Sequence, residues 1–193
     1  MNMKYNLLIN YGSSLVDKNK ITHIIELLKS VSELNGDVCE VGVYRGGTAK
    51  IISENINDCN LFLFDTFGGM PYYDLEKDKD WDVGTFNQTD YDMVSNLFKN
   101  KPNVGVYKGI FPSETSHNIQ DKKFKFVHLD VDNYQPYKES LEFFYDKMVP
   151  GGVILFDDYD CNCCPGANKA VDEFLSDKPE EVQKNVGVFI VKI

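Results

Sequence analysis

Acidic side chains recur where short apolar runs of the sequence end. Glu40 lies near the end of one run, Asp65 and Asp130 close two others, and Asp157 and Asp158 follow a fourth. Neighbouring carboxylates can hold a hard divalent cation or take up a proton in general base catalysis. Any one of these acids is explained by a helix cap or a turn. Four sets at equivalent positions indicate a functional site.

The apolar runs themselves are short and nearly continuous, as expected for parallel strands that are covered on both faces. Helical spacing of apolar residues separates them, so the chain alternates between strands and helices and predicts a doubly wound α/β sheet. In such a sheet, ligands bind beyond the carboxyl ends of the strands, where the acids lie. The expected strands are residues 38–41, 61–64, 104–107, 124–129, 153–156 and 186–191.

The helices are predicted from spacing and stop signals. Gly36 is the stop signal for the first helix, and residues 148–152, with one proline and two glycines, are interpreted as a turn before the fifth strand. The expected helices are residues 17–35, 47–55, 90–100, 137–148 and 167–175.

A glycine-rich turn follows the first strand, where Gly42 and Gly46 let the backbone approach a ligand closely. The spacing is Gly-x-x-x-Gly-Gly, which does not match the Gly-x-Gly-x-x-Gly pattern of dinucleotide-binding sites. Asp65 lies about twenty residues further on, where an acid commonly binds ribose hydroxyls. The loop and the acid together predict a site for a nucleoside without a pyrophosphate.

Composition limits the class of protein. The chain has 193 residues with 20 Lys and Arg against 30 Asp and Glu, a net charge of −10. This length predicts one domain, 1–193, and the acid excess argues against a nucleic-acid partner. No apolar run reaches the roughly 18 residues that would span a membrane, so no membrane partner is expected.

The five cysteines, an odd number without a recognisable signal peptide, predict reduced thiols and a cytoplasmic location. Three of them form the Cys161-Asn-Cys-Cys164 stretch, and this spacing is poor zinc-ligand geometry. We interpret the stretch as a thiol-rich loop.

From about residue 36 onward, the chain resembles the macrocin O-methyltransferase (TylF/MycF) family. Each motif alone is weak, and the combination is specific. The motifs are Glu40-Val-Gly-Val-Tyr-Arg-Gly-Gly-Thr48, Asp65-Thr-Phe-Gly-Gly-Met-Pro71, Lys108-Gly-Ile-Phe-Pro112, Leu129-Asp-Val-Asp-Asn-Tyr134, Pro150-Gly-Gly152, Asp157-Asp-Tyr159, Pro165-Gly166 and Ala170-Val-Asp-Glu-Phe174.

The resemblance implies a Rossmann-like class I methyltransferase fold, a mostly parallel sheet with an antiparallel last strand. It implies S-adenosylmethionine and Mg²⁺ as cofactors, a sugar hydroxyl in a small molecule or glycan as acceptor, and a homo-oligomer. Asp65 would bind the ribose, and Asp130 would contribute to both cofactor sites. The other cofactor residues would be Glu40, Gly42, Tyr44, Gly46 and Thr48 at the methionine end and Gly109, Ile110 and Phe111 around the adenine; the metal ligands would be Asp130, Asp157 and Asp158.

The positions of the acids in the sequence predict the same metal site independently of the resemblance. Asp130 and Asp157 end different strands, so they can converge on one ion without being close in sequence. Carboxylate oxygens are what Mg²⁺ requires, usually with several waters.

The general base is not assigned by the sequence. The resemblance implies a histidine in residues 72–88, and this segment contains none. Asp80 and Asp82 in this loop, His128 near the metal acids, and hydroxide bound to the cation are the alternatives. His128 is equally well explained as a core histidine with a satisfied hydrogen bond.

Residues 1–35 are predicted to form an N-terminal lid and helix region of the domain. Residues 1–16, together with the acidic and aromatic loop 72–82, are expected to form a mobile lid over the acceptor. In this hypothesis Trp81 is exposed and stacks on the face of a sugar.

Three other functions compete with sugar O-methylation. A catechol-type O-methyltransferase would place a lysine base three residues after Asp130, where Asn133 stands. An NAD-dependent oxidoreductase would carry the dinucleotide-binding glycine pattern, which this sequence lacks. That function also leaves Asp157 and Asp158 unexplained. A non-catalytic nucleoside-binding or scaffold domain has no use for the complete set of metal acids.

Overall fold

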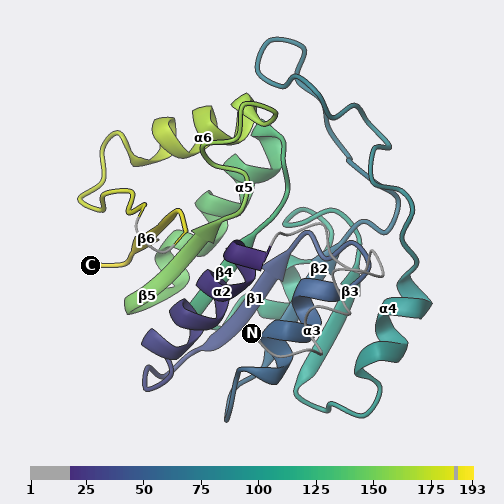
Figure 1. Ribbon diagram of the computed structural model, residues 1–193, viewed down its shortest axis with the longest axis vertical. Coiled ribbons are helices and arrows are strands. Elements are labelled where there is room, and N and C mark those ends of the chain that lie inside the picture. The colour runs from purple at the N-terminus through teal and green to yellow at the C-terminus, as the bar shows by residue number, and fades with distance from the viewer. Residues whose placement is uncertain (1–17, 185–186) are drawn as a thin grey trace.

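The computed structural model describes residues 18–184 and 187–193. Its centre is a six-stranded sheet in the order β3-β2-β1-β4-β5-β6 (Figure 1). The first five strands are parallel and β6 is antiparallel to β5, which confirms the predicted α/β fold. The strands are β1 (Asp37–Val41), β2 (Leu61–Asp65), β3 (Val104–Lys108), β4 (Phe124–Leu129), β5 (Met148–Phe156) and β6 (Phe189–Val191).

Helices cover both faces of this sheet. Alternate strand residues such as Val38 and Phe126 pack with α2, α3 and α4, whereas Cys39 and Val127 pack with α5 and α6. This double burial explains why the strands are apolar at nearly every position. The helices are α2 (Lys18–Ser30), α3 (Gly47–Glu54), α4 (Tyr91–Phe98), α5 (Tyr134–Phe144) and α6 (Pro165–Leu175), with the short 3₁₀ helices η1 (Ser116–Ile119) and η2 (Tyr145–Lys147).

Two helices begin earlier than the sequence pattern predicts. Helix α5 starts at Tyr134 rather than at residue 137, and α6 starts at Pro165 rather than at residue 167. Both contain a proline in the first turn, where the backbone N–H groups have no helical partner and a missing one costs nothing. Pro136 therefore lies inside α5 instead of marking its boundary.

The predicted turn at residues 148–152 is wrong, because β5 already begins at Met148. Met148 pairs with Phe124 and Val153 pairs with Phe126, so the residues between them bulge out of the ladder. The amide of Gly151 donates to the carbonyl of Lys192 in the segment that follows β6. These glycines extend the strand and connect it to the last described residues.

Helix α2 ends at Ser30, earlier than the predicted residue 35. The chain continues in a turn, and Gly36 then passes close to β4, where a Cβ atom would lie 2.8 Å from the amide nitrogen of Lys125. Residues 1–16, which belong to the predicted lid, lie outside the described residues. None of the helices within the described ranges is long and apolar enough to cross a membrane.

The sheet reverses its direction of winding at β1. Strand β1 pairs with β2 on one side and with β4 on the other. Such a reversal opens a crevice at the carboxyl ends of the two central strands. Gly42 and Asp130 follow β1 and β4 directly, so both lie at this crevice.

Candidate active site

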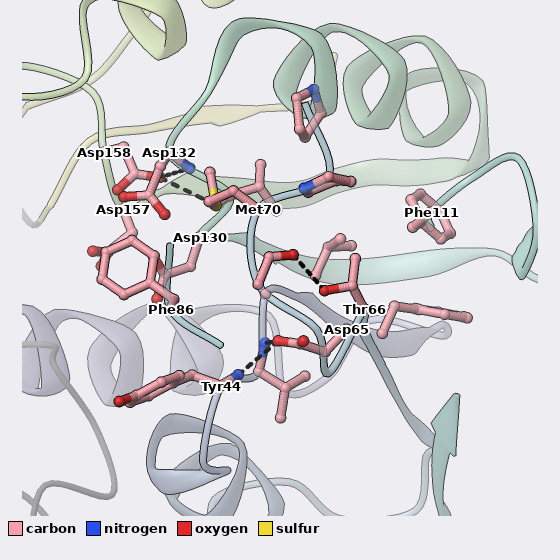
Figure 2. Close-up of a pocket in the computed structure, with 18 of the residues that line it drawn as sticks. Tyr44, Asp65, Thr66, Met70, Phe86, Phe111, Asp130, Asp132, Asp157 and Asp158 are labelled. Atoms are coloured by element: carbon pink, nitrogen blue, oxygen red, sulfur yellow. Dashed lines mark hydrogen bonds between the residues drawn. The ribbon is translucent and has the colours of Figure 1, made fainter. Parts of the chain in front are cut away.

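A cavity of about 340 Å³ lies at the carboxyl ends of the strands and is large enough for a small ligand (Figure 2). Figure 2 shows the acids grouped at one end of the cavity, Phe111 at the opposite end, and Tyr44 and Asp65 along the wall between them. The lining residues are Val41, Gly42, Val43, Tyr44, Thr48, Phe64, Asp65, Thr66, Gly69, Met70, Pro71, Trp81, Phe86, Gly109, Phe111, Asp130, Val131, Asp132, Pro136, Asp157 and Asp158.

The glycine-rich turn forms one wall of the cavity. Gly42 has a φ of +89°, and a Cβ atom there would lie 1.7 Å from the carbonyl oxygen of Asp130. Tyr44 adopts a φ of 51°, and Gly46 caps α3 in the left-handed conformation. The turn therefore brings its backbone against the end of β4 and points its own amides towards the neighbouring strand.

Asp65 holds this turn in place. Its carboxylate accepts hydrogen bonds from the amides of Val43 (2.8 Å), Tyr44 (2.7 Å) and Phe67 (2.6 Å). Burial raises the pKa of Asp65 and these three hydrogen bonds oppose the rise. The side chain thus fixes the loop and lines the cavity at the same time. A carboxylate has about four lone-pair sites, so it can accept further donors from a ligand.

The structure brings most of the predicted cofactor residues to the cavity. Three of the ten predicted residues, Glu40, Gly46 and Ile110, are not among its lining. Glu40 is fully buried beneath it, Gly46 packs against Leu97 of α4, and the amide of Ile110 bonds to Glu114. The seven predicted residues in the lining are Gly42, Tyr44, Thr48, Asp65, Gly109, Phe111 and Asp130.

The acids at the ends of β4 and β5 converge. Ligand atoms of Asp130, Asp157 and His128 lie within 4.8 Å of one another, and so do those of Asp132, Asp158 and Cys164. Asp130 and Asp157 thus meet, as their positions at two strand ends predict. Asp158 faces the second group, together with Asp132.

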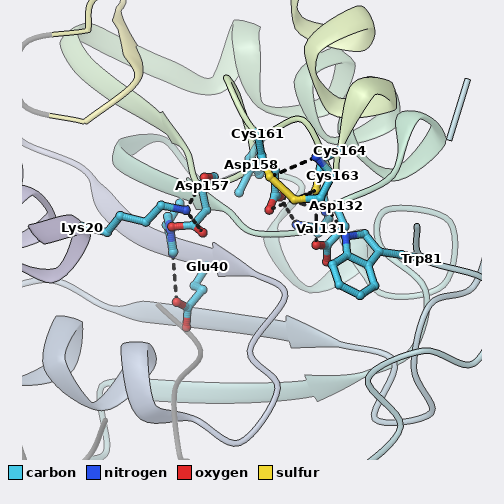
Figure 3. Close-up of polar contacts among 12 residues, drawn as sticks. Lys20, Glu40, Trp81, Val131, Asp132, Asp157, Asp158, Cys161, Cys163 and Cys164 are labelled. Atoms are coloured by element: carbon cyan, nitrogen blue, oxygen red, sulfur yellow. Dashed lines mark hydrogen bonds and ion pairs between the residues drawn. A yellow bond between two sulfur atoms is a disulfide. The ribbon is translucent and has the colours of Figure 1, made fainter. Parts of the chain in front are cut away.

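Asp157 is contacted by two basic side chains (Figure 3). The Lys20 ammonium of α2 donates to its Oδ2 and to its backbone carbonyl, both at 2.7 Å. His128 Nε2 lies 3.5 Å from its Oδ1. Burial opposes ionisation of Asp157, but His128 and Lys20 outweigh it and lower the pKa.

Asp158 is held rigidly. Its Oδ2 accepts hydrogen bonds from the amides of Val131 (3.1 Å) and Asp132 (2.9 Å) and from the Tyr137 hydroxyl (2.9 Å). Burial and the neighbouring Asp157 charge raise its pKa to about 6. Burial likewise raises the pKa of Asp130 and of Asp132 well above the usual range.

This donor set fits a divalent cation. Four carboxyl groups (Asp130, Asp132, Asp157 and Asp158) line one end of a cavity, and burial together with the neighbouring charges raises the pKa of three of them, Asp130, Asp132 and Asp158. A buried cluster of like charges is costly unless a cation compensates it. Hard carboxylate oxygens from two strand ends are suitable ligands for such an ion.

Asp132 is a cavity residue to which the sequence analysis gave no role. It follows Val131 in the motif Leu129-Asp-Val-Asp-Asn-Tyr134. Its φ of 56° turns the chain just after the end of β4. The signal was present as two aspartates separated by one residue. Alternation within a strand would have put both on the same face, but the turn sends them to different groups of the cluster.

None of the three candidate catalytic residues lines the cavity. His128 is fully buried and its Nδ1 lies 3.0 Å from Glu40 Oε1. Burial alone would lower the pKa of His128, but the carboxylates of Asp157 and Glu40 raise it to about 10. The Asp80 and Asp82 side chains are exposed, and no contact directs them towards the cavity.

The loop 72–82 is fastened to the start of α5. Buried Asp78 accepts a hydrogen bond from the Tyr134 amide (2.8 Å) and another from the Asp74 amide (2.8 Å). The Asn133 side chain donates to the carbonyls of Tyr72 (2.7 Å) and Trp81 (2.9 Å). Asn133, which replaces the lysine of a catechol-type site, thus has a structural role.

The prediction that Trp81 is exposed is wrong. Its side chain is half-buried, lines the cavity, and packs against the Phe86 ring at 4.9 Å between centroids. Its Nε1 donates to Cys164 Sγ at 3.3 Å. The indole thus forms part of the wall, and its ring nitrogen is already engaged.

The cysteines correct another prediction. Cys161 and Cys163 form a disulfide rather than reduced thiols, whereas Cys39, Cys59 and Cys164 are free (Figure 3). The two bonded cysteines are only two residues apart, so the disulfide closes a small loop and does not link separate elements. Cys164 Sγ lies 3.6 Å from Cys163 Sγ and 3.7 Å from Asp132 Oδ1, so the loop contacts the acid cluster.

Comparison with known proteins agrees with this geometry. Mycinamicin III 3''-O-methyltransferase of Micromonospora griseorubida is 25% identical over 194 residues, 89% of this chain and 74% of that protein. Demethyldecarbamoylnovobiocin O-methyltransferase of Streptomyces niveus is 22% identical over 187 residues, 83% and 67% of the two chains. The structure of the O-methyltransferase NovP superposes with a TM-score of 0.73 at 22% identity, covering 90% of this chain and 79% of that one. A sequence model of the macrocin-O-methyltransferase (TylF) family matches residues 9–187, and the chain therefore belongs to this family.

Proposed function

We propose that the protein transfers a methyl group from S-adenosylmethionine to a hydroxyl of a sugar in a glycosylated small molecule. The observation that carries the proposal is that one cavity is lined both by the glycine-rich turn that Asp65 holds and by the carboxylates around Asp130. Membership of the macrocin-O-methyltransferase family and the similarity to a mycinamicin 3''-O-methyltransferase support the reaction and the acceptor class.

The cofactor would lie along the wall between Phe111 and the acids. Phe111 offers an apolar face for the adenine, and the Asp65 carboxylate would accept hydrogen bonds from the ribose hydroxyls. Tyr44 and Thr48 line the part of the cavity left for the methionine end. The sulfonium methyl group would then face the acidic end of the cavity.

In the reaction, the acceptor oxygen forms a bond to the methyl carbon while the carbon–sulfur bond breaks. The electron pair of that bond remains on sulfur, which gives S-adenosylhomocysteine, and the hydroxyl proton goes to a base. Because the methyl donor is already activated, the chain contributes alignment, which can supply several kcal/mol and up to about 7–11 kcal/mol in the best cases.

We assign the Mg²⁺ ligands to Asp130, Asp157 and Asp158. These residues would hold the ion, and its Lewis-acid chemistry would lower the pKa of an acceptor hydroxyl. Asp157 would be oriented by Lys20, and Asp158 by the three donors on its Oδ2, so both carboxylates are in place before a ligand enters.

Asp132 is the base that this geometry favours. It lines the cavity beside the other acids, and removal from water raises its pKa well above the usual value, so its carboxylate readily takes a proton. By contrast, Asp80 and Asp82 are exposed and His128 lies behind the cavity wall.

The test compares cofactor binding with methyl transfer. We expect calorimetry to show binding of S-adenosylmethionine, and Asp157→Asn, at a residue assigned to the cation alone, to lower the transfer rate by about 10²-fold or more while cofactor affinity changes only a few-fold. Asp80→Asn, at an exposed position outside the cavity, is the matched control and should retain full activity.

Two results would contradict the proposal in different ways. Binding of NAD in place of S-adenosylmethionine would exclude the methyl-transfer reaction. Full activity in the presence of excess EDTA would leave methyl transfer intact and remove the cation from it.

A further inference from the structure

We propose that His128 is an additional ligand of the cation and that Glu40 is its positioning residue, so the site prefers a transition ion such as Mn²⁺ to Mg²⁺. This inference rests on the cation site of the proposed function and deepens it. The sequence gives His128 two readings, base or core residue, and the contacts of its two ring nitrogens point to a third.

The first ring nitrogen is bound by Glu40. Residues Glu40 of β1 and His128 of β4 are direct partners in the sheet register, and both side chains are fully buried. His128 Nδ1 lies 3.0 Å from Glu40 Oε1. A carboxylate accepts a hydrogen bond and cannot donate one when ionised, so Nδ1 carries the proton in this pair.

The second ring nitrogen is directed at the acid cluster. His128 Nε2 has no hydrogen-bond partner among the described residues although it is buried. Asp157 Oδ1, at 3.5 Å, is too distant for a well-formed hydrogen bond. Together with Asp130 and Asp157, this nitrogen forms a group whose ligand atoms all lie within 4.8 Å of one another. A buried nitrogen that faces two carboxylates without a well-formed hydrogen bond to either is the arrangement expected of a metal ligand.

Glu40 and His128 then form a carboxylate–histidine pair of the kind found behind metal-binding histidines. In such pairs the carboxylate fixes the tautomer and the ring orientation, and it raises the basicity of the nitrogen that binds the ion. A cation entering the group would replace any proton on Nε2, and this proton would leave to water. Glu40, which lies outside the cavity lining, thereby gains a role in the site.

Lys20 completes the arrangement around Asp157. Its ammonium binds Oδ2 and the backbone carbonyl of Asp157, which leaves Oδ1 on the side of His128. The donors offered to the ion are then one imidazole nitrogen in addition to the carboxylate oxygens of Asp130, Asp157 and Asp158. Imidazole favours transition ions, whereas Mg²⁺ prefers oxygen ligands and water.

The experiment uses the full chain freed of metal and titrated with Mn²⁺. Pulsed electron paramagnetic resonance of bound Mn²⁺ should show a hyperfine coupling to a directly bound nitrogen, which changes in the expected way when the protein is labelled with ¹⁵N-histidine. His128→Gln should abolish this coupling and lower Mn²⁺ affinity by about 10–100-fold, with a much smaller effect on Mg²⁺. His117→Gln, which changes an exposed histidine, should leave both unchanged.

The ¹⁵N-histidine measurement on the unaltered protein keeps the test decisive even if His128→Gln does not fold. Mn²⁺ binding without nitrogen coupling, or with coupling that persists in His128→Gln, overturns the inference and leaves the proposed function intact. Nitrogen coupling in a protein that binds no S-adenosylmethionine supports the metal ligand and defeats the proposed function. Failure to bind either ion defeats this inference together with the cation part of the proposed function.

Discussion

A Cβ atom on Gly42 would lie 1.7 Å from the carbonyl oxygen of Asp130, so the chain segments that follow β1 and β4 are in backbone contact. The amide of Asp130 also donates to the carbonyl of Val41, which fixes this contact from the other side. The cavity wall and the first acid of the cluster are thus one unit, and a change in either residue displaces the other.

Gly42→Ala should be strongly destabilising. The left-handed φ of +89° and the overlap with Asp130 together cost about 2–6 kcal/mol. Gly84→Ala is a matched control, because Gly84 has a φ of +85° and nothing within 4 Å of its Cβ position. It should cost only about 1–2 kcal/mol. Urea unfolding of both variants measures the difference, and equal losses would show that the close approach carries no cost.

Asp78→Ala should release the loop 72–82. The substitution removes the acceptor for the amides of Tyr134 and Asp74, and losses of this kind cost about 0.5–2 kcal/mol. Trypsin should then cleave after the exposed Lys79 several-fold faster than in the unaltered protein. Asp82→Ala, in the same loop but with an exposed side chain that does not adjoin the cleaved bond, should not change the rate; equal acceleration in both variants would disprove the anchoring role.

Glu180 should control part of the acid denaturation. Burial alone would raise the pKa of its carboxyl, but hydrogen bonds from Lys192 and Tyr145 lower it to about 2. Because the folded pKa lies below the unfolded value of 4.5, the stabilisation is present above about pH 4.5 and is lost as the pH falls towards 2.

Glu180→Gln should therefore lower the free energy of unfolding at neutral pH by about 1–3 kcal/mol. The loss should shrink as the pH approaches 2, as urea titrations at several pH values can measure. Glu181→Gln, at the exposed neighbouring position, is the control and should leave the curve unchanged. A pH-independent loss in Glu180→Gln would argue against an ionised carboxylate.

The thiols can be counted chemically. Alkylation of the unfolded oxidised protein should label Cys39, Cys59 and Cys164, and prior reduction should add Cys161 and Cys163. Because the closed loop is so short, loss of the disulfide should cost no more than about 2 kcal/mol. Mass spectrometry of the alkylated protein decides the matter: labelling of all five without reduction would restore the reduced-thiol prediction.

Much of the fold followed from periodicity alone. The strands are buried on both faces, so their apolar runs stand out, and their carboxyl ends share one edge of the sheet. This is why the meeting of Asp130 and Asp157 could be predicted from positions 27 residues apart. The start of α5 was missed because Pro136 looks like a boundary, although in a first turn it breaks no hydrogen bond.

The contacts between loops could not be predicted in the same way. The sequence around Asp78 does not distinguish this residue, which is buried against the start of α5, from the exposed Asp80 and Asp82. The burial of Trp81 depends on Cys164, far away in the sequence. Such contacts arise only once β5 and α6 have brought the later segment beside the earlier one.

The side-chain amide of Asn133 has a consequence for protein engineering. It donates to the carbonyls of Tyr72 and Trp81 and so ties two points of a long segment to the beginning of α5. A lysine introduced there to deprotonate a phenol would leave at least one of those carbonyls without its donor. Redesigning this scaffold for phenolic acceptors would therefore require a rebuilt segment as well as a new base.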